Sequence, residues 1–493
     1  MIDLAMTISR SLSRLVRLVS LRRPILFATL PLAILSGCAV GPDYVQPEVN
    51  LTPAFRHQDG WQATAVLLEK QDDQREQGPW WTIYADEDLD RLMRDVAKGN
   101  ATLAQSEAQW RQARALIGSA RALGLPVIDA SLARTRNGGN TTTASNLYTA
   151  GLDVSWMPDL WGRVARQREA ALADTQAFAA LHDAARLALQ LEAAQGYVRV
   201  RALDQQAALL ARALTAYERS LQLTRHQYEA GFVARADVIQ AETQLQALRT
   251  QISANNRQRT LEEHALATLA GSTPAQWRLA VKDVPLPTAP VVPTVLPSAL
   301  LIQRPDIAAA ERQVASANAR IGVAQSAWLP DLVLGASGTL RAGGWEALWD
   351  APTRIWSAGP SLAATLFDGG TRRAAREQAI AVYDERAAAW RAAVLLGVRE
   401  TEDALAALES LAIQDAQQQQ LVKLASENEQ VVTYRYQAGE ITFLEVATAQ
   451  NLALDSRRTA LDVQASRLTA SMQLVAALGG NWTGMREDGA LKD

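Results

Sequence analysis

The stretch from Tyr148 to Ala165, YTAGLDVSWMPDLWGRVA, decides the fold because it contains a change from strand to helix. Up to Trp156, apolar residues alternate with Thr, Gly, Asp and Ser, the period-two pattern of a β-strand with two unlike faces. After Gly162, good helix formers continue without a proline as far as Gly231. About 66 helical residues would form a rod of roughly 100 Å, far longer than the usual globular helix.

This strand belongs to a predicted hairpin, and the chain contains a second hairpin of the same kind. Asn137-Gly138-Gly139-Asn140 supplies the turn signal of the first hairpin, and Gly343-Gly344 supplies that of the second. The four expected strands cover about residues 127–136, 147–157, 331–341 and 354–366. About ten residues is the length at which a tilted strand spans an outer membrane.

The hairpins belong to two tandem repeats, which superimpose at an offset of 204 to 208 residues, with Gly118 matching Gly322 and Gly162 matching Gly370. A single helix is expected from about Asp86 to Gly124, with Pro126 preventing its continuation. After each long helix, a helix of about 35 residues should end at Gly271 or Gly479. The two shorter helices of a repeat, placed end to end, would roughly match the long one.

These features divide the chain into six parts. Residues 1–37 are expected to be a lipoprotein signal peptide, 38–85 an extended N-terminal arm, 86–284 the first repeat, 285–298 a Pro-rich linker, 299–480 the second repeat and 481–493 a C-terminal tail.

The N-terminus carries an export signal. An Arg-rich stretch precedes the apolar residues 24–35, which are fewer than the ~20 needed for a membrane-spanning helix. They lead into Leu35-Ser36-Gly37-Cys38, which resembles a bacterial lipobox and holds the only cysteine. The pattern predicts cleavage before Cys38 and acylation of that residue; the alternative is an ordinary secretory signal with an incidental cysteine. Since Ala39 stands where Asp would favour the inner membrane, the outer membrane is the expected destination.

The composition excludes several classes of function. Without residues 1–37, the chain has 44 basic and 51 acidic residues, a balance that gives no basic surface for nucleic acid. A single cysteine excludes a disulfide framework or a multi-cysteine metal site. The four histidines are not arranged as H-x-x-x-H, and neither a G-x-S-x-G elbow nor a phosphate loop occurs. We therefore expect no catalytic residues, no metal and no cofactor other than the lipid on Cys38.

The predicted strands require more than one chain. Known outer-membrane barrels start at eight strands, and open strand edges in lipid are unfavourable. The mature chain has no second apolar run of about 18 residues, so it would cross a membrane only as strands. Three chains would supply twelve strands, but this arithmetic alone leaves two or four chains open.

Five motifs carry a resemblance to a known family. In chain order they are Cys38-Ala-Val-Gly-Pro-Asp-Tyr44, Asp159-Leu-Trp-Gly-Arg163, Arg304-Pro-Asp-Ile307, Leu366-Phe-Asp-Gly-Gly370 and Tyr434-Arg-Tyr-Gln-Ala-Gly439. With these motifs, over nearly its whole mature length, the chain resembles the outer-membrane factor family of tripartite RND-type efflux pumps. It is most similar to the lipoprotein branch, which is TolC-like and includes nodulation-type proteins.

The resemblance implies a mainly α protein with a small β part: a homotrimer with a twelve-stranded β-barrel in the outer membrane and a long α-helical barrel in the periplasm. It also implies docking to a periplasmic adaptor, the membrane fusion protein, and to an inner-membrane pump of the RND class. The chain would then conduct small molecules passively, as in drug resistance. Two alternatives stay open: the exit duct of a type I protein secretion system, and a structural periplasmic coiled-coil lipoprotein.

The two helix turns are expected to form the periplasmic mouth and to dock the adaptor. The residues that mark the turns are Tyr228, Gly231, Tyr436 and Gly439. In the family, acidic residues at the start of the following helix form a constriction. Glu445 matches that pattern, Asp237 is its repeat equivalent, and Thr448 stands where a second Asp is common. Arg435 and Glu440 complete the candidate aperture, with Arg435 a partner for Glu445 across the turn.

Helix capping is the competing interpretation of the same acidic residues. Thr442 and Glu445 have the spacing of a capping box, and Asp237 suits a helix N-terminus. The two roles can coexist.

Several tryptophans surround the hairpins, at positions 156, 161, 345, 349 and 356. They could form interfacial aromatic belts or pack at the change from strand to helix. For Trp161, which lies next to Gly162, packing is favoured.

Overall fold

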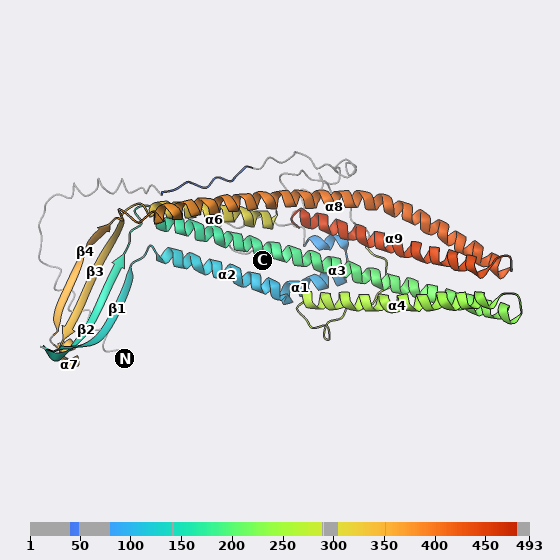
Figure 1. Ribbon diagram of the computed structural model, residues 1–493, viewed down its shortest axis with the longest axis horizontal. Coiled ribbons are helices and arrows are strands. Elements are labelled where there is room, and N and C mark those ends of the chain that lie inside the picture. The colour runs from blue at the N-terminus through green and yellow to red at the C-terminus, as the bar shows by residue number, and fades with distance from the viewer. Residues whose placement is uncertain are drawn as a thin grey trace. The chain divides into compact units, whose positions relative to one another are not determined.

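The computed structural model describes residues 40–48, 79–140, 142–287, 289, 304–350 and 352–480, which fall into two compact units. One unit contains the sheet and includes Leu125–Ala165 and Ser326–Thr365. The other contains the helical pairs and includes Gly41–Gly124, Arg166–Gln325 and the chain from Leu366 onward (Figure 1). Cys38 with the predicted signal peptide, most of the Pro-rich linker and the C-terminal tail lie outside the described residues.

The sheet has four antiparallel strands in the order β1-β2-β3-β4. The strands are β1 (Val127–Gly139), β2 (Thr142–Trp156), β3 (Asp331–Ala342) and β4 (Thr353–Ala363). The hairpins of the two repeats join through β2 and β3, with Trp156 opposite Leu334. β1 and β4 therefore form the two edges of the sheet.

The strand ends differ from the sequence expectation at three places. β1 continues through Asn137–Gly139 with a register shift, so the turn follows Gly139 and β2 already begins at Thr142. Beyond Gly343-Gly344, the second hairpin contains a short helix, α7 (Trp345–Asp350), in place of a tight turn. β4 ends at Ala363 instead of residue 366, because the chain leaves the strand before the next helix begins.

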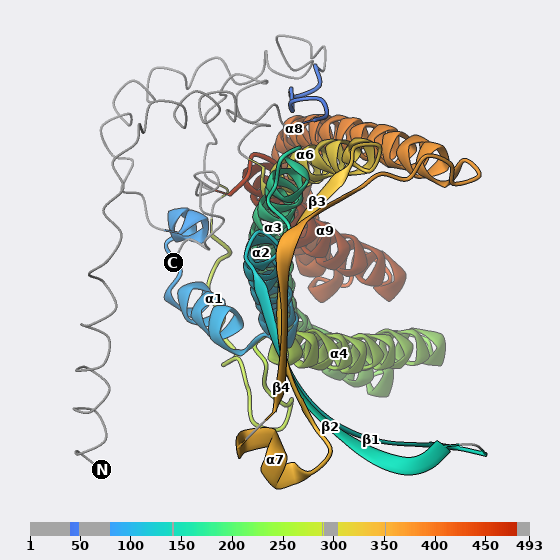
Figure 2. The same ribbon diagram turned by 90° about the vertical axis from the view of Figure 1, so that its left-hand side faces the viewer.

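Each repeat contains one helix of 67 residues and one of 35 residues, which confirms the lengths expected from the sequence. The long helices are α3 (Arg163–Glu229) and α8 (Thr371–Gln437), and the shorter ones are α4 (Arg235–Leu269) and α9 (Phe443–Ala477). The pairs α3/α4 and α8/α9 lie side by side in both views (Figures 1 and 2). Within the part of the chain that the structure describes, no helix is both long and apolar enough to cross a membrane.

The expectation of a single helix from Asp86 to Gly124 is wrong, because the helix breaks at Asn100 into α1 (Glu87–Gly99) and α2 (Ala101–Ala122). The Asn100 side chain accepts a hydrogen bond from the Leu103 N–H (3.1 Å), which caps α2. Its amide also donates to the carbonyl oxygen of Leu269 at the end of α4 (2.8 Å). Asn100 therefore joins the start of α2 to the end of α4, so that these two helices lie end to end.

The second repeat has the corresponding joint. Its helix α6 (Pro305–Ser326) follows Arg304, whose guanidinium donates to the carbonyl oxygen of Ala477 at the end of α9 (3.1 Å). Arg304 is largely buried and also forms ion pairs with Asp306 (2.8 Å) and Glu400 (2.7 Å). Asn100 and Arg304 are 204 residues apart, and Leu269 and Ala477 are 208 apart, so the same joint occurs in both repeats with different chemistry.

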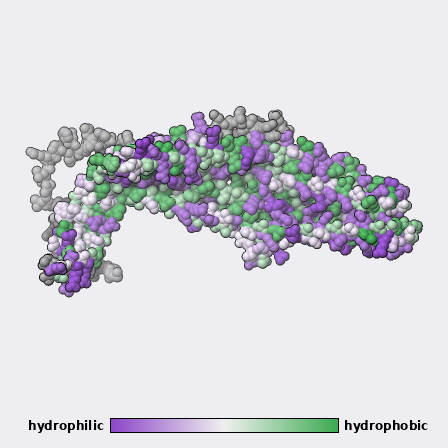
Figure 3. Space-filling view, viewed as in Figure 1, coloured by the Kyte–Doolittle hydropathy of each residue, from purple (hydrophilic) through white to green (hydrophobic). Residues whose placement is uncertain are grey.

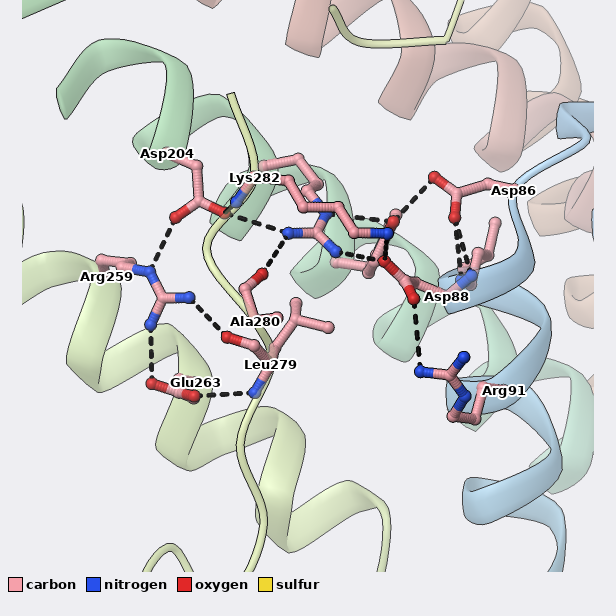
Figure 4. A network of polar contacts seen from close by, with 12 residues as sticks. Asp86, Asp88, Arg91, Asp204, Arg259, Glu263, Leu279, Ala280 and Lys282 are labelled. Carbon is pink, nitrogen blue, oxygen red and sulfur yellow. Dashed lines mark hydrogen bonds and ion pairs between the residues drawn. The ribbon is translucent and has the colours of Figure 1, made fainter. Parts of the chain in front are cut away.

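A buried ionic network holds the middle of α3 in the first repeat (Figure 4). Arg201 pairs with Asp88 of α1 (2.7 Å) and with Asp204 (3.1 Å), and its side chain is only 4% exposed. Arg259 of α4 pairs with the second oxygen of Asp204 (2.7 Å), and Lys282 pairs with Asp88. The network thus fastens α1, α4 and the segment after α4 to one point on α3.

Candidate functional site

The two helix turns, which we call the tips, have the same backbone geometry. Gly231 and Gly439 adopt left-handed φ values of 79° and 76°. The N–H of the residue after each glycine donates to the carbonyl oxygen five residues earlier: Phe232 to Gln227 (2.8 Å) and Glu440 to Arg435 (3.0 Å). This is the Schellman arrangement, which satisfies the last helix carbonyls and needs a residue without a Cβ penalty.

The tips pack against each other through residues that lie far apart in the sequence. Tyr436 is buried, shares a hydrogen bond with Thr224 of α3 (2.9 Å), and packs edge-on against Phe443 (5.8 Å between centroids). Burial raises the pKa of Tyr436, and the nearby charge of Asp237 acts in the same direction. By contrast, Tyr228 is half exposed. The two tyrosines that mark the turns therefore have different surroundings.

The candidate aperture residues also differ between the tips. Asp237 accepts a hydrogen bond from the N–H of Ala234 (3.2 Å), so its carboxylate does cap the start of α4. At α9, Thr442 makes no side-chain capping bond, and Glu445 is exposed. The capping box predicted for Thr442 and Glu445 is therefore wrong. Arg435 pairs with Glu440 (3.2 Å) inside its own turn, and not with Glu445 as predicted.

The sheet presents two chemically different faces. Apart from the end of β1 beyond its register shift at Asn137, the strand register places the even-numbered residues of the four strands on one face and the odd-numbered residues on the other. The even face carries apolar side chains such as Leu132, Val154 and Leu362. The odd face carries the carboxylates of the strands, and Ser337 and Ser357 share a hydrogen bond there (2.8 Å).

The start of the described chain is docked on the helices. Asp43 pairs with the buried Arg166 of α3 (2.8 Å), and the carbonyl of Pro42 accepts a hydrogen bond from Asn318 of α6 (2.9 Å). Gly41 fits closely, because an added Cβ would lie 2.4 Å from the Cα of Gly322. Residues 41–43, which lie three to five positions after the predicted lipid anchor at Cys38, thus contact both repeats.

The tryptophans at the hairpins divide into two groups. Trp161 donates to the carbonyl of Pro330 (2.7 Å), so it packs where strand changes to helix, as favoured from the sequence. Trp345 and Trp349 stack edge-on (5.8 Å) and are about half exposed. In the described ranges, no group of three or more His, Cys, Asp or Glu is placed to hold a metal ion.

The sequence model of the outer membrane efflux protein family matches the chain twice, at residues 92–272 and 296–480. The two matches start 204 residues apart and end 208 residues apart, which are the offsets of the internal repeat.

Curated relatives cover nearly the whole chain. The pyoverdine export outer membrane protein OpmQ of Pseudomonas aeruginosa is 30% identical over 426 residues, which are 84% of this chain and 90% of the relative. Nodulation protein T of Rhizobium leguminosarum is 29% identical over 462 residues, with 91% and 90% covered.

Solved structures of outer-membrane channels have the same fold. The outer-membrane channel OprN superimposes with a TM-score of 0.81 at 27% identity, over 90% of this chain and all of that one. The open state of the MtrE channel of Neisseria gonorrhoeae gives 0.78 at 26% identity, over 90% and 99%.

The chain therefore belongs to the outer membrane efflux protein family, which confirms the resemblance found in the sequence motifs. Its fold is that of the TolC-like channels, and it is an outer-membrane efflux component of a Gram-negative cell. Its relatives are channel proteins.

Proposed function

We propose that three copies of this chain form one exit duct, which passively conducts small molecules from a periplasmic adaptor and an RND-type inner-membrane pump to the exterior. The two-faced sheet with open edges carries the proposal. The even face suits lipid, the odd face suits a water-filled lumen, and the edges β1 and β4 need partners. Three sheets supply twelve strands and close one barrel.

Native mass spectrometry in detergent tests the stoichiometry, with a trimer expected and a stable folded monomer, dimer or tetramer contradicting it. Val154→Arg should weaken insertion by ~2–4 kcal/mol if Val154 faces lipid near the bilayer centre. Ser155→Arg is the matched control, because Ser155 is next to Val154 in the strand but lies on the odd face, where the charge should be tolerated. Equal losses from both variants would contradict the assignment of the faces.

The lipid anchor is part of the proposal. Cys38 is the only cysteine, and its neighbours resemble a lipobox. Residues 41–43 dock on α3 and α6, which would hold the acylated end of the chain against the helices. Intact-mass analysis of membrane-extracted protein should find an acylated Cys38 at the N-terminus and no residues 1–37, whereas Cys38→Ser should lose the lipid and keep the fold. A mature chain that retains residues upstream of Cys38 would contradict this.

The tips support the assignment of partners. Phe232 is 81% exposed and Tyr228 is half exposed at the end of the first helical pair. Both are accessible aromatic side chains at the first tip, which suits contact with an adaptor. Site-specific cross-linking from position 232 in cells should capture the adaptor, and from position 217, which is buried on α3, it should not. The names of two relatives mention pyoverdine and toluene, and these substrates are those of the relatives. In this system the inner-membrane pump, more than the duct, would determine which substrate is exported.

The duct needs no chemistry on its cargo, so the proposal includes neither a catalytic step nor a cofactor besides the lipid. It also places Asp237 and Glu445 at the periplasmic constriction, with Arg435 and Glu440 beside them in the second tip.

A further inference from the structure

The arginines of the sheet gather at the hairpin ends of the strands. The strands contain Arg134 and Arg136 in β1, Arg341 in β3 and Arg354 in β4, and they contain no lysine. Figure 3 shows hydrophilic residues concentrated at this end of the sheet, beyond the paler strands. The opposite strand ends connect to the helices. If the helices are periplasmic, the arginines lie on the exterior side.

Three of these arginines share the apolar face. The register pairs Arg134 with Tyr148, Arg136 with Asn146, and Arg354 with Leu340, so all three are on the even face. That face has no carboxylate on any strand, because the aspartates of the strands are all odd-numbered. In the described ranges, no ion pair is formed by Arg134, Arg136 or Arg354, and all three side chains are exposed.

Aromatic rings accompany these cations. The guanidinium of Arg134 lies over the Tyr148 ring (5.5 Å), Tyr148 packs edge-on against Trp345 (6.1 Å), and Trp345 packs against Trp349. Such rings favour the boundary between the hydrocarbon core and the headgroups of a bilayer. Glu346 and Asp350 are the acidic residues nearest in sequence to these tryptophans, but they belong to α7 and not to a strand. The charged strand residues on the even face are therefore all positive.

We propose that Arg134, Arg136 and Arg354 bind the phosphate groups of phosphorylated lipid in the outer leaflet, at each seam between two protomers. The inference rests on the proposed shared barrel, in which β4 of one protomer adjoins β1 of the next. Arg354 then comes to the same end of the seam as Arg134 and Arg136 of the neighbour. Three guanidinium groups on a lipid-facing surface need anionic partners, and phosphate matches their forked geometry.

The test uses the purified, delipidated trimer in detergent and titrates it with lipopolysaccharide, followed by native mass spectrometry. Replacing all three arginines with Gln should weaken binding on the order of 100-fold, since each basic group near an anionic headgroup contributes about a factor of five. Arg341→Gln is the matched control, because Arg341 lies at the same end of the strands on the odd face. It should bind like the wild type.

Two further probes identify the ligand. Dephosphorylated lipopolysaccharide should bind the wild type as weakly as the triple variant binds the phosphorylated form. Inorganic phosphate should not compete at millimolar concentration; effective competition would show a general anion site and overturn the assignment to lipid. Equal binding of both lipopolysaccharides, or an equal loss in Arg341→Gln, would also overturn it.

Conductance in planar bilayers separates this inference from the proposed function. The triple variant should still insert as a trimer and conduct, and Arg354→Gln alone, which should weaken binding about fivefold, serves if the triple variant does not assemble. A wild type that conducts but does not distinguish the two lipids would refute only the lipid site. A wild type that forms no channel would refute the duct itself.

Discussion

The two repeats fold the same helices around different interiors. Where the first repeat buries Tyr197 and Arg201 in an ionic network, the positions 208 residues later are Leu405 and Glu409. Leu405 belongs to an apolar cluster with Leu408 of α8 and with residues of α9. A long antiparallel helical pair can therefore be fixed at its middle either by paired charges or by packed leucines. The duplication preserved the backbone and let the chemistry of the two interiors diverge.

The joints between the shorter helices show the same divergence. In the first repeat the joint is neutral and close, because Gly271 approaches Gly99 so nearly that an added Cβ would lie 1.9 Å from the Gly99 oxygen. In the second repeat the charged Arg304, at the position equivalent to Asn100, donates to the Ala477 carbonyl and pairs with Glu400. The difference suggests that the two halves respond differently to salt and pH, although their backbones correspond.

The largest expected effect comes from breaking the ionic network of the first repeat. Arg201→Met leaves Asp88 and Asp204 each without one of their partners in a buried setting, and should lower the free energy of unfolding by about 3–5 kcal/mol. Leu405→Ala, in the apolar cluster of the second repeat, removes only apolar contacts and should cost about 2–5 kcal/mol. Thermal unfolding of the trimer in detergent measures both.

The pH dependence separates these two variants. The hydrogen bond from Lys282, with a contribution from the charge of Arg201, lowers the pKa of Asp88. A lowered carboxyl pKa stabilises the fold above the ordinary value of about 3.9, and that contribution is lost as the pH falls through the folded value. The difference in the free energy of unfolding between wild type and Arg201→Met should therefore become smaller below pH 4. The difference between wild type and Leu405→Ala should not change with pH. If both differences became smaller together, the ionic origin of the Arg201 effect would be contradicted.

The next effect concerns the close joint of the first repeat. Gly271 has a φ of 69° in addition to its contact with Gly99, so Gly271→Ala combines left-handed strain with a steric clash and should cost about 3 kcal/mol or more. Gly231→Ala is the control, since Gly231 has a similar φ of 79° but open space around it. It should cost only about 1–2 kcal/mol. Equal melting temperatures of the two variants would show that the backbone at Gly99 and Gly271 shifts to accommodate the added methyl group.

The polar side chains at the two joints, Arg304 and Asn100, should differ less in how much they contribute to stability. Arg304→Met leaves the Ala477 carbonyl without its donor, and its ion partners are both about 40% exposed, so we expect a loss of about 2 kcal/mol. Asn100→Ala removes a helix cap and a hydrogen bond to Leu269, for about 1–2 kcal/mol. High salt should reduce the Arg304 effect and leave the Asn100 effect unchanged, because only the first is partly ionic.

The sequence predicted the regular elements well because their signals are local. Absence of proline over more than sixty residues and alternation of apolar residues do not depend on distant contacts. The break at Asn100 was missed, although Gly99 followed by Asn100 is a helix stop followed by a helix start. The break also depends on Leu269, 169 residues away. Likewise, the burial of Tyr436 follows from Thr224, which no local pattern could indicate.

The acidic residues at the two tips show how far the sequence reached at the candidate site. Glu445 and Asp237 were correctly paired as repeat equivalents, but their sequence context suggested caps at both helices. The structure shows a capping hydrogen bond only for Asp237. The carboxylate of Asp237 accepts from the N–H of Ala234, whereas no such bond forms between Glu445 and Thr442.

The smallest energetic effect, and the sharpest functional one, is expected at these two residues. Asp237→Ala should cost about 1 kcal/mol because it removes a cap, while Glu445→Ala should leave stability nearly unchanged because the exposed carboxylate makes no capping bond. If both carboxylates line the constriction, each variant should raise single-channel conductance in planar bilayers, and the double variant should raise it most. Glu445→Ala is the cleaner probe, since a change in conductance there has no accompanying loss of a helix cap. Conductance at the wild-type level in Glu445→Ala, together with fraying of the first tip in Asp237→Ala, would leave the acidic residues a purely structural role and place the constriction elsewhere.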